Sequence, residues 1–180
     1  MRRLFLCLLI TVFALPAFAQ AKHPFTFDDM MKLKRVGEPE ISPDGKWVIF
    51  SVVDVDLAAN TKTPHIWIVP TAGGQEKEII ADQDADRPRW APDGKRFAFL
   101  SMKAGGSQVW AADFESANGE VTGVYKLTSI PTEASGELWS PGGQYILFTS
   151  DVYPECDNRD AMLETSCNAR RLKEAEESKV

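Results

Sequence analysis

The sequence lacks every short motif that would build a complete catalytic or metal centre. It contains no Gly-x-Ser-x-Gly, His-Glu-x-x-His, phosphate-loop, dinucleotide-binding or Cys-x-x-Cys motif. These absences remove the common signatures of serine hydrolases, zinc peptidases, nucleotide-binding enzymes and thiol oxidoreductases from the chain. It has only two histidines, His23 near the start and His65 beside Trp67, and each fits a structural or exposed role better than that of a catalytic base. We therefore expect no catalytic residue, no metal ligand and no cofactor.

The sequence also lacks an excess of basic residues. Lys and Arg number 20 against 26 Asp and Glu, which gives a net charge of −6. Nucleic acids and anionic membrane surfaces attract basic patches, so this balance argues against both as partners. Plain solubility is the simpler explanation of the acidic excess.

Long apolar runs are missing from all but the first residues. Arg2 and Arg3 precede an apolar stretch at residues 4–15, and small residues follow up to Ala19. This pattern predicts a signal peptide over residues 1–19, with cleavage after Ala19 or, alternatively, after Ala21. We expect the protein to be periplasmic or secreted, to leave the membrane after cleavage, and to carry a net charge of −8 once the two arginines are lost.

Cysteine is scarce, and Cys7 falls inside the predicted signal peptide. Cys156 and Cys167 remain, and export would permit a disulfide between them. Closing a loop of about 12 residues would stabilise the fold by roughly 3 kcal/mol. Two free thiols are the alternative, whereas a zinc site would need further ligands. The sequence leaves the pairing open.

One turn pattern recurs at a fixed spacing. Ser-Pro-Asp-Gly at residues 42–45, Ala-Pro-Asp-Gly at 91–94 and Ser-Pro-Gly-Gly at 140–143 place their prolines 49 residues apart both times. Proline second and glycine fourth suit a type I turn. A period of this length indicates a repeat architecture in which no unit can bury its apolar face alone.

Each turn is followed by a β-branched and aromatic stretch whose continuous apolar character predicts strands buried on both faces. In the first repeat we expect strands at residues 47–52, 65–69 and 77–80, with a loop over 54–64; in the second, the third and fourth strands at 108–112 and 124–128. Four short antiparallel strands per unit describe the blade of a β-propeller. An unrelated β-sandwich is the alternative, and the constant spacing disfavours it.

The predicted fold is therefore all-β: a partial propeller of about two and a half blades with a charged, helical C-terminal segment. A lead-in segment covers residues 20–37, and the propeller covers 38–150, with blades at 38–82, 86–130 and, in part, 136–150. Residues 151–180 form a cysteine-bearing insertion, in which Arg170 with Glu174 and Lys173 with Glu177 support a helix.

Two further patterns have a simpler structural explanation than a ligand site. The tryptophans could form a sugar-binding platform, but Trp90 with Trp139 and Trp67 with Trp110 lie at equivalent places, which favours packing between blades. The acidic residues 82–86 resemble the start of a calcium loop but lack its glycine and distal glutamate, so we expect a connector between blades.

The opening of the chain and its cysteine segment resemble a known family. Residues 27–36 (FDDMMKLKRV), residues 39–46 (PEISPDGK) and the run YPEC at 153–156 are similar to exported bacterial peptidases of the prolyl oligopeptidase family, of the dipeptidyl-peptidase and acylaminoacyl-peptidase type. The resemblance implies a propeller that restricts entry of short peptides to a C-terminal α/β-hydrolase domain carrying Ser, Asp and His. None of that catalytic motif occurs in the sequence.

Three interpretations follow from the sequence. The leading one is the N-terminal propeller part of a serine exopeptidase, inactive alone, with peptide substrates reached through a missing hydrolase domain. The alternative is a periplasmic protein-binding propeller of the TolB type without catalytic activity. The third is a truncated product whose unpaired strand edges would favour homo-oligomers.

Overall fold

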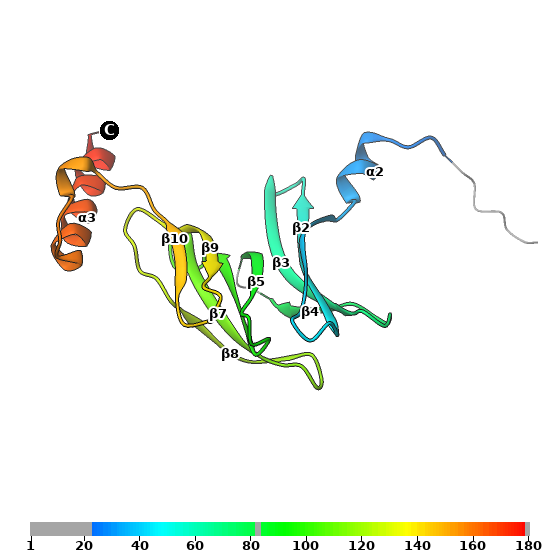
Figure 1. Cartoon of the computed structure of the whole chain (residues 1–180). Helices are drawn as coiled ribbons and strands as arrows, with labels where there is room; N and C mark the ends of the chain where they lie inside the picture. Colours follow the sequence, from blue (N-terminus) through cyan, green and yellow to red (C-terminus); the bar gives the residue numbers. More distant parts are fainter. Residues whose placement is uncertain (1–22, 82–83, 179–180) are drawn as a thin grey trace, which may run out of the picture. The chain divides into compact units, whose positions relative to one another are not determined.

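A computed structural model describes residues 23–81 and 84–178. The predicted signal peptide, Cys7 and part of the predicted acidic connector lie outside these residues. The described strands form three antiparallel sheets that follow one another along the chain (Figure 1). We call them blades 1, 2 and 3.

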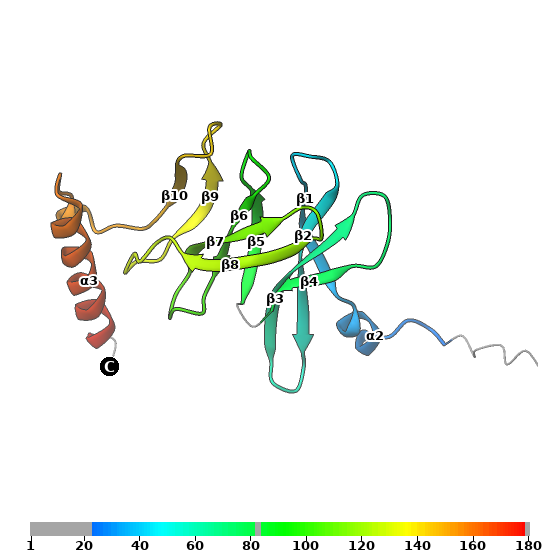
Figure 2. The same cartoon turned by 90° about the horizontal axis from the view of Figure 1, so that it is seen from below.

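Blade 1 contains β1 (Arg35–Ile41), β2 (Trp47–Asp56), β3 (Thr61–Pro70) and β4 (Lys77–Ile80). Blade 2 contains β5 (Ala85–Trp90), β6 (Arg96–Ser101), β7 (Gln108–Glu115) and β8 (Glu120–Lys126). Blade 3 contains β9 (Ser135–Trp139) and β10 (Ile146–Thr149). In blades 1 and 2 each strand pairs with its neighbour in sequence, so the first strand of each blade is an edge of its sheet (Figure 2). The sheets confirm the predicted all-β class with two four-stranded blades and part of a third.

The recurring turn forms in the same way in all three blades. The amide of its glycine donates to the carbonyl three residues earlier, at 2.8 Å for Gly45 to Ser42 and at 2.9 Å for Gly94 to Ala91 and for Gly143 to Ser140. Each glycine has a positive φ, between 65° and 72°, which side-chain-bearing residues seldom adopt. The glycine of the pattern therefore sets the connection between the first and second strand of each blade.

The loop predicted over residues 54–64 is wrong. β2 and β3 pair without interruption from Trp47 opposite Pro70 to Asp56 opposite Thr61. The Asp56 side chain accepts hydrogen bonds from the amides of Ala58 and Ala59, both at 2.9 Å, and thereby closes a tight turn. The polar composition that suggested a loop reflects a hairpin end exposed to solvent. In blade 2, β7 and β8 likewise remain paired up to their shared turn, where Glu115 lies opposite Glu120.

The apolar core lies between the blades. One cluster joins blades 1 and 2 and includes the fully buried side chains of Ile49, Ile66, Phe97 and Phe99. A second joins blade 2 to blade 3, where Ala98 and Val109 pack near Trp139, Ile146 and Phe148. The expectation of burial on both faces is wrong for residues 145–149, because Leu147 on β10 is 67% exposed.

Two helical segments occur in the sequence before and after the sheets. α2 (Phe27–Lys32) begins with a reciprocal cap, in which the Thr26 amide donates to Asp29 at 2.9 Å and the Asp29 amide donates to the Thr26 hydroxyl at 3.2 Å. After blade 3 come the short 3-10 helix η1 (Pro154–Cys156) and α3 (Ala161–Glu177), which confirms the predicted helical C-terminal segment. No helix within the described ranges combines the length and apolar character needed to cross a membrane.

Candidate functional site on the first strands of the blades

The first strand of each blade contains a β-bulge at the same repeat position. Pairing of β1 with β2 skips residues 38–39, and pairing of β5 with β6 skips residues 87–88. In blade 3 the register shifts opposite residues 136–137. The first bulge residue has a left-handed backbone in every case, with φ of 53° at Glu38, 55° at Arg87 and 64° at Gly136. These three positions lie 49 residues apart.

Two of these bulges hold a charged residue in a strained conformation. Glycine adopts a left-handed backbone readily, as Gly136 does, but the side chains of Glu38 and Arg87 make it costly, by about 1 kcal/mol or more each. Such strain is concentrated at functional sites, where the surrounding structure maintains it. The first strands are therefore the place where a site is best sought.

Arg89 is the centre of an ion-pair cluster between blades 1 and 2. Its Nη2 lies 2.5 Å from Glu38 Oε2, and its Nε lies 3.5 Å from Glu40 Oε1. Glu40 also accepts a hydrogen bond of 3.1 Å from the Trp90 amide through its other carboxylate oxygen. One arginine and two carboxylates thereby connect the edge strands β1 and β5.

These contacts act on the pKa values of both partners. The hydrogen bond from Arg89 lowers the pKa of Glu38 below its ordinary value. Burial opposes the charge of Arg89, but the hydrogen bond to Glu38 and the carboxylates of Glu40 and Glu137 outweigh it and raise the Arg89 pKa. These directions favour the charged forms of both Glu38 and Arg89 at neutral pH.

Glu137 lies at the bulge of blade 3 and differs from its equivalents. The corresponding residues are prolines, Pro39 in blade 1 and Pro88 in blade 2, and Pro88 is fully buried. Glu137 is only 3% exposed, and within residues 23–81 and 84–178 neither of its carboxylate oxygens has a hydrogen-bond partner. Burial raises its pKa, although its own backbone amide and then the positive charges of Arg87 and Arg89 oppose the shift.

Arg87 adds an opposite charge to the same region. Its Nε is buried and, in the described part of the chain, also lacks a hydrogen-bond partner. Asp86 beside it contributes a negative charge that raises the pKa of Glu137 further. An unpartnered guanidinium nitrogen and an unpartnered carboxylate near each other can bind a polar group that offers both an acceptor and a donor. A peptide backbone offers both.

We call Glu38, Glu40, Arg87, Arg89 and Glu137 together the first-strand cluster. The sequence alone did not predict it. The signal was present, since Pro39 and Pro88 are 49 residues apart and each precedes a charged residue, Glu40 or Arg89. Glu137 is visible only as the residue that replaces proline at the third occurrence. The repeated position held by Pro39, Pro88 and Glu137 lies four residues before each proline of the recurring turn, and the turn pattern alone does not point to it.

The residues that the sequence did single out lie elsewhere. His23 Nδ1 is 3.6 Å from Asp29, and His65 Nδ1 is 2.8 Å from Glu78, so both histidines contact carboxylates outside the first-strand cluster. Trp90 and Trp139 occupy equivalent places between blades, as expected, and Trp110 packs against the core between blades 1 and 2. Trp67 differs, because it lines a surface hollow on blade 1.

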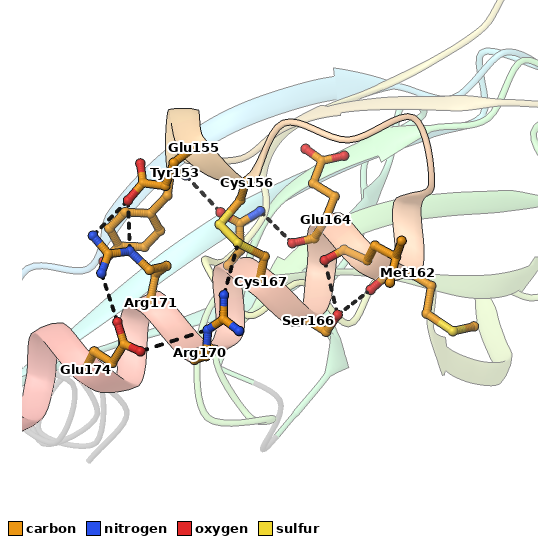
Figure 3. The surroundings of a disulfide bond; sticks show 12 residues. Tyr153, Glu155, Cys156, Met162, Glu164, Ser166, Cys167, Arg170, Arg171 and Glu174 are labelled. Atoms are coloured by element: carbon orange, nitrogen blue, oxygen red, sulfur yellow. Dashed lines mark hydrogen bonds and ion pairs between the residues drawn. A yellow bond between two sulfur atoms is a disulfide. The ribbon is translucent and has the colours of Figure 1, made fainter.

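Cys156 and Cys167 form a disulfide that joins η1 to α3, with an S–S distance of 2.03 Å. Asn168 is buried beside it and accepts a hydrogen bond of 2.8 Å from the Tyr153 amide. Figure 3 shows Arg171 next to the ring of Tyr153 and between the carboxylates of Glu155 and Glu174. The predicted pair of Arg170 and Glu174 is present at 3.9 Å, and that of Lys173 and Glu177 at 3.8 Å.

A hollow of about 730 Å³ lies between the loops of blade 2 and the C-terminal segment. Its lining includes Gln108, Lys126 and Glu133, and also Tyr153 and Leu172 of the C-terminal segment. In the ranges that the structure describes, no buried side chain with an unpartnered polar atom reaches it. The first-strand cluster, which has two such side chains, is therefore the stronger candidate site.

Comparisons with known proteins agree with this architecture. No protein-family model matches the chain. The sequence is 33% identical over 130 residues to the uncharacterized peptidase YuxL of Bacillus subtilis and 32% identical over 137 residues to dipeptidyl-peptidase 5 of Porphyromonas gingivalis. Each match covers 71% of this chain, and the chain spans 19% of the length of each of these two relatives. The expected resemblance to peptidases is thereby confirmed.

Solved structures show the same fold. Acylaminoacyl peptidase of Pyrococcus horikoshii superposes on 73% of the chain with a TM-score of 0.56 at 21% identity, and 19% of that protein is covered. The β-propeller domain of a protease from Pyrococcus furiosus gives a TM-score of 0.52 at 20% identity over 72% of the chain and 38% of that domain. TolB of Acinetobacter baumannii gives 0.51 at 27% identity over 64% of the chain and 26% of TolB.

Proposed function

We propose that this chain, whose sequence resembles the N-terminal propeller portion of peptidases of the prolyl oligopeptidase family, forms a wall past which short peptides reach a serine-peptidase active site. The catalytic Ser, Asp and His would belong to an α/β-hydrolase domain, because the sequence contains no Gly-x-Ser-x-Gly motif. The proposed activity of the whole protein is dipeptidyl- or acylaminoacyl-peptidase-like.

The observation that carries this proposal is the broken symmetry at the bulges. Contacts that only hold blades together repeat from blade to blade, as the turns and the tryptophans do. The first bulge residue is instead Glu38 in blade 1, Arg87 in blade 2 and Gly136 in blade 3. The second bulge residue is proline in blades 1 and 2 but Glu137 in blade 3. Glu38 contacts Arg89 of the next blade, whereas Arg87 Nε and the Glu137 carboxylate have no hydrogen-bond partner among the described residues and are therefore available to a ligand.

The first test uses the purified chain alone. We expect no reaction with a serine-directed fluorophosphonate probe and no hydrolysis of dipeptidyl or acylaminoacyl substrates, because the nucleophile would lie in another domain. A matched sample of an active serine peptidase verifies the probe. Labelling of this chain would contradict the proposed division of labour.

The gating role needs a test in the peptidase that carries this propeller. Glu137→Gln and Arg87→Gln remove the two unpartnered charges, so we expect the KM for peptides to change while the rate of probe labelling stays the same. Glu176→Gln, at an exposed position of α3, serves as a control. Unchanged KM values for short and long peptides in both variants would exclude a substrate-facing role for the cluster.

A second candidate function is a protein-binding propeller without catalysis. The similarity to TolB at a TM-score of 0.51 and 27% identity favours it. The coding sequence beyond Val180 distinguishes the two candidates. Further blades followed by a Gly-x-Ser-x-Gly motif would support the peptidase, whereas further blades followed by a stop codon would support the binding protein.

We also propose that the protein works outside the cytoplasm. The disulfide between Cys156 and Cys167 supports this, since such bonds form and persist in oxidising compartments. Fractionation of the producing cells, followed by N-terminal sequencing, tests it. A start at Gln20 or Lys22 in the periplasm or medium is expected, and an intact Met1 in the cytoplasm would contradict it.

A further inference from the structure

The turn between β7 and β8 joins blade 2 to blade 1. The Ser116 carbonyl accepts a hydrogen bond of 3.0 Å from the Trp47 indole, and the Ser116 hydroxyl donates one of 2.5 Å to Asp44. Gly119 ends the turn and is buried, and a Cβ atom there would lie 2.5 Å from the Trp47 ring. Blades 1 and 2 each have four strands, so this contact lies between two whole blades.

Asn118 and Gly119 form an asparagine–glycine pair at the end of this turn. The backbone nitrogen of the residue after an asparagine can attack the side-chain amide, which makes asparagine one of the less durable residues. Glycine leaves the approach open because it has no side chain. Asn118 is exposed. Asn60 is exposed in another turn but precedes Thr61, whose β-branched side chain crowds the same approach.

The reaction requires no other group than water. The Gly119 nitrogen attacks Cγ of Asn118, so that the N–Cγ bond forms and the Cγ–Nδ2 bond breaks. Nδ2 leaves as ammonia, with the proton of the Gly119 amide. Water then opens the cyclic imide at one of its two carbonyl carbons and gives aspartate or isoaspartate. Isoaspartate lengthens the main chain, because its Cβ atom becomes part of the backbone.

The folded turn holds both reacting groups in other contacts. The Gly119 amide donates to the Glu115 carbonyl at 2.9 Å, which retains the proton that the attack must release. The Asn118 side chain is held by Glu120, whose amide donates to Oδ1 at 3.2 Å and whose carboxylate accepts from Nδ2 at 3.3 Å. The Trp47 ring lies against Gly119. The attack therefore needs the turn to leave blade 1.

We propose that Asn118 is a site of spontaneous deamidation that reacts when the β7–β8 turn opens away from blade 1. The rate of this reaction follows the population of the locally opened state at the boundary between blades 1 and 2. An isoaspartate formed in one opening cannot restore the original turn, because the longer main chain displaces Gly119 from its place beside Trp47. The modification thus makes the next opening easier.

Peptide mapping by mass spectrometry tests the proposal after timed incubation of the purified chain at mildly alkaline pH, with and without urea. Deamidation of Asn118 should be at least about tenfold slower in the folded chain than in the unfolded chain. In the unfolded chain Asn118 should react faster than Asn60. Equal rates at Asn118 in the folded and unfolded chain, or an unfolded Asn118 no faster than Asn60, would overturn the proposal.

A substitution in the turn tests the role of the contact with blade 1. Ser116→Ala removes the hydrogen bond to Asp44 and keeps the carbonyl that accepts from Trp47. Deamidation of the folded variant should be about threefold faster or more, as expected for the loss of one hydrogen bond. Ser129→Ala, at an exposed position after β8, is the matched control, and circular dichroism verifies both folds. Equal rates in the two variants would contradict protection by blade 1.

Pulse proteolysis at an intermediate urea concentration tests the effect of the modification on the fold. Chains that contain isoaspartate at position 118 should open and be cleaved first, so the surviving chains should be depleted of isoaspartate. Survivors with an unchanged isoaspartate content would show that the longer main chain does not weaken the boundary, and would overturn that part of the proposal.

Discussion

The indole Nε1 of Trp139 donates a hydrogen bond of 3.0 Å to the backbone carbonyl of Arg89, across the boundary between two blades. The same bond joins Trp90 to Glu40 at 3.4 Å, one boundary earlier. Donors and acceptors are both separated by 49 residues, so the period of the sequence corresponds to a repeated contact between sheets. The first blade has Ile41 at this position, and Ile41 is 66% exposed.

Removing this hydrogen bond should loosen the boundary between blades 2 and 3. Trp139→Phe deletes the donor and leaves the Arg89 carbonyl without the indole, so we expect a loss of about 1 kcal/mol in the free energy of unfolding. Urea denaturation followed by circular dichroism measures it. Trp110→Phe is a matched control, because its buried Nε1 has no partner in the described ranges. Equal losses for both variants would show that ring size, not the bond, matters.

Gly119 on blade 2 lies close to the ring of Trp47 on blade 1. A Cβ atom there would lie 2.5 Å from the ring of Trp47, whose own Nε1 donates to the Ser116 carbonyl at 3.0 Å. Gly119→Ala should therefore separate the two blades at this point and destabilise the fold by about 2–4 kcal/mol, from backbone strain and overpacking together.

Gly105 provides the control for that substitution. Its φ of 87° is also left-handed, but no atom lies within 4 Å of the added Cβ. Gly105→Ala should therefore cost only the backbone term of about 1–2 kcal/mol. Thermal or urea unfolding of both variants measures the difference, and a Gly119→Ala variant no less stable than Gly105→Ala would refute the close contact with Trp47.

Glu137 should make stability depend on pH in the opposite sense to a carboxylate in an ion pair. Burial raises its pKa in the folded protein, so the folded state holds the proton more tightly than the unfolded state. The loss of stability caused by burying the ionised Glu137 carboxylate is absent below the unfolded-state pKa of about 4.3 and develops as the pH rises through the folded-state pKa. Glu137→Gln should thus stabilise the protein by about 1 kcal/mol at neutral pH.

Urea denaturation at acid and neutral pH measures the difference in the free energy of unfolding between Glu137→Gln and wild type. The difference should vanish near pH 4. Glu176→Gln, at an exposed position on α3, should show no such trend. A constant difference across the pH range would mean that the Glu137 carboxylate is not destabilised by burial.

The disulfide should stabilise the C-terminal segment and leave the blades unaffected. Replacing Cys156 and Cys167 together by serine removes a cross-link worth about 3 kcal/mol to the η1–α3 unit. We expect faster tryptic cleavage after Arg170 and Arg171, with unchanged cleavage at the lysines of blade 1. Mass spectrometry of timed digests measures both rates. Equal cleavage of the two forms at Arg170 would contradict a stabilising role.

The sequence predicted the blades because the turn residues have a strict local cause. Proline at 43, 92 and 141, each followed two residues later by glycine, defines one backbone conformation, and the apolar strands after it can be buried only by a neighbouring sheet. The length of the β2–β3 hairpin was not predictable in this way. Its polar end pairs through backbone hydrogen bonds, which composition does not report.

The candidate site was largely hidden from the sequence. The ion pair of Arg89 and Glu38 joins residues 51 positions apart, and their meeting depends on how two edge strands approach each other. The bulge itself leaves little trace, since Glu38 and Arg87 are unusual residues for a left-handed backbone. Glu137 became conspicuous only through its burial, which follows from the packing of blade 3.

The most direct test of the stacked-blade account is the proton NMR of the indole groups. Nuclear Overhauser contacts should connect the indole Hε1 of Trp90 to the backbone at Glu40 and, with the same pattern, the Hε1 of Trp139 to the backbone at Arg89. The account predicts both sets of contacts in the folded chain. Contacts at one tryptophan without the equivalent contacts at the other, or at neither, would contradict it.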